Sequence, residues 1–145
     1  MSKILYCSPI WNPALRKNIS LLEKIQQRFT KRMAGLQNLS YIERLSQLGA
    51  LSVENRLVFA DLVTAFKAIH GGWASDFGLS LSEASTRSRG IRLLQRRANS
   101  KLSSNMFLCR VPSMWNKLPV EILTCSSLPG FKKLLKKHLF LSQVT

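Results

Sequence analysis

The chain has 145 residues, 46% of them hydrophobic, and its 22 Lys and Arg against 7 Asp and Glu give a formal net charge of +15 at pH 7. This length and apolar content exclude a disordered chain and match one ordinary domain. The charge indicates a polyanionic partner, with nucleic acid as the first class to consider and an anionic membrane surface as the second.

The cysteines and the N-terminal residues indicate the cellular compartment in which the protein is expected. Cys7, Cys109 and Cys125 are odd in number and widely spaced, which argues against a disulfide framework. The first residues lack the features of a signal peptide, and no apolar run approaches the length of a membrane span. We therefore expect a location in the cytoplasm or nucleus, no secretion and no membrane span.

The stretch "WNPALRKNISLLEKIQQRFTKRMAG" predicts one amphipathic helix. Asn12 suits its N-cap, Pro13 its first turn and Gly35 its C-terminus. Apolar residues at three- and four-residue steps predict the inward face: Leu15, Ile19, Leu22, Ile25, Phe29 and Met33. Basic residues fall together on the opposite face: Lys17, Lys24, Arg28 and Lys31. Only Gln26 interrupts the apolar side.

Two further helices are expected before residue 72. Ser40 and Glu43 have the spacing of a capping box for the first, and Ser52 suits the N-cap of the second. The second helix has an apolar stripe formed by Phe59, Leu62, Val63, Phe66 and Ile69, and Gly71-Gly72 ends it. Asp61 lies off that stripe, so we expect its carboxylate to face solvent.

Residues 73–105 lose the apolar periodicity and are rich in Ser and Arg. They predict a long loop that becomes ordered on contact, with a short extended piece over 90–94. This loop has the densest run of positive charge on a flexible backbone: Arg87, Arg89, Arg92, Arg96, Arg97 and Lys101.

Apolar periodicity returns from residue 106. Pro112 lacks a backbone donor, so we expect a kink or two short helices around it, and Pro119 can open a turn through Leu123. A last helix begins at Ser126 or Ser127. Its expected inward residues are Phe131, Leu134, Leu135, His138 and Leu139, and its other sides carry Lys132, Lys133, Lys136 and Lys137.

Together these elements predict an all-α fold in a single domain over residues 1–145. It has a helical part at 12–72, the basic loop at 73–105 and a C-terminal helical part at 106–141. The oligomeric state does not follow from these patterns.

The residues Phe59, Ala60 and Asp61 resemble the start of the aromatic-x-Asp-Asp motif with which polymerases that copy RNA bind metal, but Leu62 replaces the second aspartate. A two-metal mechanism needs several converging carboxylates, and Asp61 has none nearby in the sequence. The histidines and cysteines also lack the paired spacing of a zinc site. We predict no catalytic residue, no metal, no cofactor and no small-molecule substrate.

The three basic segments predict non-specific contacts with the phosphates of RNA or DNA. Trp11, Trp73 and Trp115 can stack on bases, although a place in the core is the simpler interpretation of each. Two alternatives stay open. The chain can be a structural or interaction module that binds no nucleic acid, or a protein that lies on a membrane surface.

Several segments, in order, resemble the C-terminal region of the polyprotein of jockey-like non-LTR (LINE-type) retrotransposons. They are "ILYCSPIWNP", "LLEKIQQRFTKRM", "LSYIERLSQLGALSVENRLVFADLVTAFKAIHG", "TRSRG", "FLCRVPSMWNKLP" and "SLPGFKKLLKKHL". The resemblance covers nearly the whole chain, and the order and spacing of its short motifs make it specific.

The resemblance implies a non-catalytic part of a larger enzyme. The family's polyprotein carries an endonuclease and a reverse transcriptase (RNA-directed DNA polymerase), whose catalytic aspartates belong to domains upstream of this region. It implies a structural role for Trp115, Asn116, Leu118 and Pro119, and it places Pro112 where the family commonly has an aliphatic residue. Because Met1 lies inside the resemblance, we expect a truncated fragment with some apolar surface left exposed.

Overall fold

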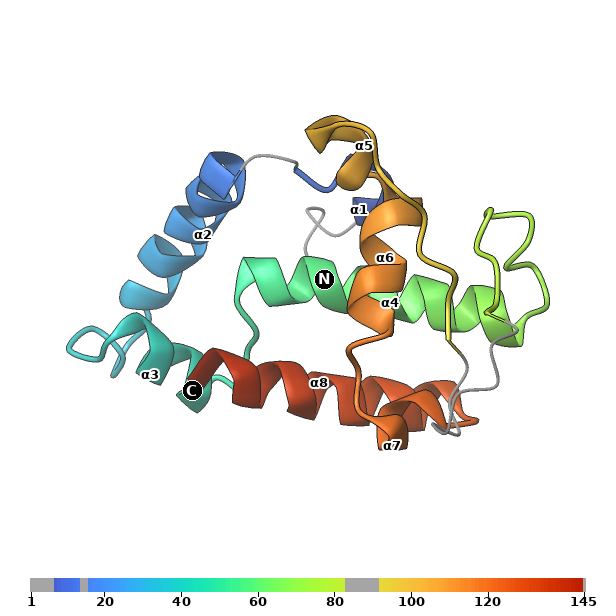
Figure 1. Ribbon diagram of the computed structural model, residues 1–145. Helices are drawn as coiled ribbons and strands as arrows, with labels where there is room; N and C mark the ends of the chain where they lie inside the picture. The colour runs from blue at the N-terminus through green and yellow to red at the C-terminus, as the bar shows by residue number, and fades with distance from the viewer. Residues whose placement is uncertain (1–6, 14–15, 83–91, 145) are drawn as a thin grey trace.

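Two long antiparallel helices form the centre of the molecule. The computed structural model describes residues 7–13, 16–82 and 92–144. Helix α4 spans Val53–His70 and helix α8 spans Leu128–Val144, and they lie side by side (Figure 1). The start of α4 meets the end of α8, where the Asn55 side chain donates to the Leu139 carbonyl oxygen at 3.1 Å.

The other elements surround this pair. Helix α6 (Phe107–Trp115) crosses α4, whereas α2 (Arg16–Lys31) and α3 (Tyr41–Gln47) lie toward the C-terminal end of α8 (Figure 1). Among the described residues, the β-structure consists of one isolated antiparallel bridge between Leu81 and Leu93. The prediction of an all-α fold is therefore confirmed. The remaining helices are α1 (Ser8–Trp11), α5 (Lys101–Ser104) and α7 (Val120–Leu123).

The expected N-caps of α3 and α4 are present. The Ser40 hydroxyl accepts from the Glu43 backbone N–H at 3.4 Å, and the Glu43 carboxylate accepts from the Ser40 N–H at 2.7 Å. These hydrogen bonds lower the pKa of the Glu43 carboxyl. At the start of α4, the Ser52 hydroxyl accepts from the Asn55 N–H at 3.2 Å. Both caps satisfy donors that a helix start leaves unpaired.

Three stacked aromatic side chains join α4, α6 and α8. The Phe131 ring lies 4.3 Å from the Phe66 ring and 5.7 Å from the Trp115 ring, measured between centroids. All three side chains are buried. Trp115 therefore lies in the core, as expected, and the half-buried Trp73 packs against the same core. The side chain of Trp11 lies outside the described part.

The predicted helix from Asn12 to Gly35 differs in its bounds. Helix α1 ends at Trp11, Asn12 and Pro13 are not helical, and α2 runs from Arg16 to Lys31. The Asn12 side chain donates to Asp61 at 3.2 Å through its Nδ2. Residues 14–15, whose backbone N–H groups the expected Asn12 cap would bind, lie outside the described residues.

The predicted inward face of α2 is also wrong in part. Ile25 and Phe29 are 59% and 68% exposed, whereas Ile19 and Leu22 are half-buried. Met33 is exposed too, and Leu15 lies outside the described residues. Part of the apolar stripe therefore faces away from the core.

Polar contacts explain why α2 is rotated about its axis, so that part of its apolar stripe faces away from the core. The Glu23 carboxylate accepts from the Tyr41 hydroxyl and, at 2.9 Å, from the Val53 N–H. The Gln26 amide donates to the Leu51 carbonyl oxygen at 3.1 Å, and the buried Thr30 hydroxyl accepts from Arg44 at 3.2 Å. Because these bonds satisfy buried backbone and side-chain groups, they turn Glu23, Gln26 and Thr30 inward.

The C-terminal half departs from expectation at two points. Pro112 lies inside α6, which continues from Phe107 to Trp115 as one helix, so the expectation of two short helices is wrong. Leu134, expected to face inward, is 38% exposed, while Phe131, Leu135 and Leu139 are buried as expected.

Parts of the expected loop at 73–105 are ordered. Of the extended piece expected over 90–94, residues 92–94 pair with residues 80–82 around the Leu81–Leu93 bridge, and residues 90–91 lie outside the described residues. Lys101–Ser104 forms α5. The Asn116 side chain accepts from the Leu93 N–H at 3.0 Å and donates to its carbonyl oxygen at 2.8 Å. Asn116 thus forms with Leu93 the pair of hydrogen bonds that a neighbouring strand would form. Leu118 is buried and Pro119 is the N-cap residue of α7, so residues 115–119 have structural roles.

We predict that Phe131→Ala destabilises the protein by about 3–5 kcal/mol, because it removes a fully buried ring and leaves a cavity. Phe29→Ala is the matched control: it removes the same ring from an exposed position and should change stability by less than about 0.5 kcal/mol. Urea unfolding followed by circular dichroism measures both. Equal losses for the two variants would contradict this core.

Candidate nucleic-acid interface

Asp61 is a buried partner of Arg110. Its side chain is 0% exposed, and Arg110 donates to it through Nε to Oδ2 at 2.8 Å and through Nη2 to Oδ1 at 3.1 Å. The expectation that Asp61 faces solvent is wrong, because α1 and α6 cover that side of α4. No local pattern indicates this contact, since the two residues are 49 positions apart in the chain.

The polar groups of this ion pair make further hydrogen bonds within the protein. Arg110 also donates to the Pro9 carbonyl oxygen at 2.7 Å and to the Asn105 carbonyl oxygen, and Asn12 adds a second donor to Asp61. Burial raises the pKa of the Asp61 carboxyl, and the bonds from Arg110 and Asn12 offset part of that rise. Both carboxylate oxygens are used by protein donors, so Asp61 has a structural role.

No group of three or more His, Cys, Asp and Glu side chains that could hold a metal ion occurs among the residues that the structure describes. The same residues contain no helix that is both long enough and apolar enough to cross a membrane.

The cations that the sequence suggested for nucleic-acid contact are exposed wherever their side chains are described, with one exception. Exposed side chains are those of Lys17, Lys24, Arg28, Lys31, Arg96, Arg97, Lys132, Lys133, Lys136 and Lys137. The exception is Arg92, which is half-buried and donates to the Asn116 carbonyl oxygen at 2.9 Å. Arg87, Arg89 and the side chain of Lys101 lie outside the described residues.

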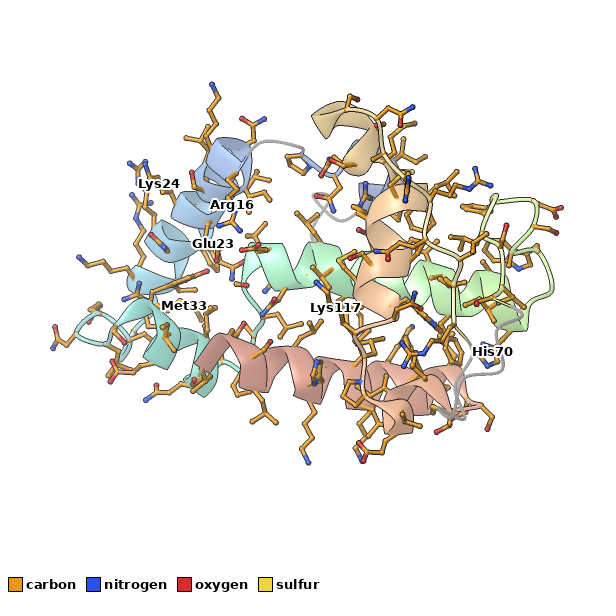
Figure 2. The ribbon with its side chains drawn as sticks, viewed as in Figure 1. Arg16, Glu23, Lys24, Met33, His70 and Lys117 are labelled. Carbon is orange, nitrogen blue, oxygen red and sulfur yellow. The ribbon has the colours of Figure 1, made fainter. Side chains whose placement is uncertain are left out.

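The structure groups only some of these cations. Those of α2 lie on a helix that stands apart from α8, and Figure 2 shows Lys24 on the side of α2 that faces away from α4, with Glu23 on the side toward it. The cations of α2 and those of α8 therefore form separate surfaces.

A cavity of about 620 Å³ is lined by α4, α8 and the segment that precedes α4. We call it the α4–α8 pocket. Among the described residues, its lining has apolar and cationic side chains and one threonine, and no acidic side chain: Leu48, Gly49, Ala50, Leu51, Arg56, Phe59, Ala60, Val63, Thr64, Lys67, Lys132 and Lys136.

The pocket joins two predicted cations, Lys132 and Lys136, to two that the sequence analysis missed, Arg56 and Lys67. A signal for the missed pair was present in the sequence. Residues 56, 60, 63 and 67 are separated by four, three and four positions, so they lie on one face of a helix. What the sequence could not indicate is that this face borders the lysines of α8.

No protein-family model, curated protein or solved structure matches this chain.

We predict that Asp61→Ala destabilises the protein by about 3–5 kcal/mol, because it leaves the Arg110 guanidinium without its counter-charge in a nearly buried site. Asp76→Ala, which removes an exposed carboxylate, is the control and should cost less than about 0.5 kcal/mol. Chemical unfolding measures both values.

A double variant separates the effect of the charge on stability from the effect of packing. Asp61→Leu combined with Arg110→Met replaces the pair by apolar side chains and should be more stable than Asp61→Ala alone. If Asp61→Ala costs no more than Asp76→Ala, the ion pair does not hold α4, α6 and the α1 segment together.

Proposed function

We propose that this chain is a non-catalytic part of a retrotransposon reverse-transcriptase polyprotein and binds the backbone of RNA or DNA, in the cytoplasm or nucleus. The order of its segments, which resembles the C-terminal region of jockey-like polyproteins, supports the origin. In such a parent protein, the exposed cations of this chain would hold template RNA or target DNA near the polymerase. Catalysis would belong to upstream domains.

The charge of α8 is the observation that carries the binding proposal. The helix has lysines at 132, 133, 136 and 137 and no acidic residue. All four side chains are exposed. Exposed lysines can neutralise phosphates and release the counterions condensed on nucleic acid, which favours binding at low salt without reading the sequence.

A second candidate is a structural or interaction module that binds no nucleic acid. The exposed apolar side chains of α2, Leu21, Ile25 and Phe29, favour it. An apolar helix face of this kind is typical of a surface that packs against another part of a larger protein.

We predict that affinity for a mixed-sequence duplex falls steeply between about 50 and 200 mM salt, because each phosphate contact contributes a slope of roughly 0.9 in log affinity against log salt. Replacing Lys132, Lys133, Lys136 and Lys137 together by Gln should weaken binding and reduce that slope by about 2–4. A filter-binding titration over several salt concentrations measures both quantities.

The variant with Arg at the same four positions is the control, since it keeps the charge and should keep the slope. Circular dichroism checks that both variants stay helical. No affinity at low salt, or affinity that does not change with salt, would rule out backbone binding and favour the structural module.

A further inference from the structure

The α4–α8 pocket combines an apolar floor with a cationic rim. Among its described lining residues the half-buried Phe59 has the one aromatic ring, and Ala60 and Gly49 are small. Lys132 and Lys136 lie one turn apart on the α8 side. A ligand that fits must therefore bring negative charge to the rim and an apolar or planar group to the floor.

The antiparallel packing places the rim cations at both ends of the pocket. Phe66 stacks on Phe131 and Asn55 bonds to Leu139, so the end of α4 that carries Lys67 lies by the Lys132 end of α8. Arg56 lies toward the opposite end, where its Nε donates to the Leu51 carbonyl oxygen at 3.1 Å. A bound chain would meet positive charge along the length of the pocket.

A double helix does not fit these two requirements. Its phosphates can reach the rim, but its bases are stacked inside and offer nothing to the floor. A single strand has both parts, because its unstacked bases can lie on an aromatic side chain while the adjoining phosphates contact lysines.

We propose that the α4–α8 pocket binds single-stranded nucleic acid, with one base against Phe59 and the flanking phosphates on Lys67, Lys132 and Lys136. This inference rests on the proposed function and adds to it a preference for single strands. The alternative occupant is an acidic amphipathic helix of a protein partner, which would place apolar side chains on the same lining.

Fluorescence anisotropy with three labelled ligands at one salt concentration tests the proposal. They are an oligothymidylate of about 12 nucleotides, an abasic deoxyribose-phosphate oligomer of the same length, and a duplex of that length. The protein should bind oligothymidylate about tenfold more tightly than the abasic oligomer, because base stacking on an aromatic side chain adds to the phosphate contacts.

Two variants assign that difference to the pocket. Phe59→Leu removes the ring but keeps an apolar side chain, and Ala60→Leu fills space beside the ring with a good helix former. Each should lower the affinity for oligothymidylate by about tenfold and leave binding of the abasic oligomer and the duplex unchanged. Phe77→Leu, at an exposed ring outside the pocket, is the matched control and should change none of the three affinities.

The outcomes separate this inference from the proposed function. Salt-dependent binding of all three ligands with equal affinity, or equal loss for all three in Phe59→Leu, would overturn the single-strand pocket and leave backbone binding standing. No binding of any ligand would overturn both. Binding of an acidic amphipathic Glu/Leu peptide that requires Phe59, without any preference for oligothymidylate, would assign the pocket to a protein partner and overturn the inference.

Discussion

The buried ion pair between Asp61 and Arg110 constrains the rest of the structure. A carboxylate in the middle of a buried helix is costly unless a cation reaches it, and only a docked α6 brings Arg110 to bonds of 2.8 and 3.1 Å. The same guanidinium bonds the Pro9 carbonyl oxygen, so the segment of α1 is fixed at the same place. One charge thus holds two parts of the chain, α6 and the α1 segment, against α4.

With α6 and α1 on one side of α4, α8 packs along another side through the Phe66–Phe131 stack. This arrangement uses some of the positive charge internally, since Arg110 and the buried Arg44 serve the fold. The lysines of α8 stay exposed, and their helix carries no acidic residue. The scaffold therefore separates a few structural cations from a larger exposed set, and this separation is the physical basis for proposing contact with a polyanion.

Features that depend on close neighbours in the sequence could be predicted, and features that depend on distant partners could not. The capping box of Ser40 and Glu43 involves residues three positions apart, so its sequence pattern is sufficient. The rotation of α2 depends on bonds such as that from Gln26 to Leu51, 25 positions away, which turned Phe29 outward. For the candidate site, the exposed lysines of α8 were predictable from helical spacing, whereas their meeting with Arg56 and Lys67 required the packing of α4 on α8.

We propose that nucleic acid binds where α4 and α8 meet, and nuclear magnetic resonance can locate the contact residue by residue. Backbone amide shifts of the labelled protein would be followed while a short oligothymidylate is added. We expect the largest shift changes in residues 56–67 of α4 and 132–137 of α8, with little change in α7. Changes confined to other segments, or none at concentrations where anisotropy shows binding, would contradict it.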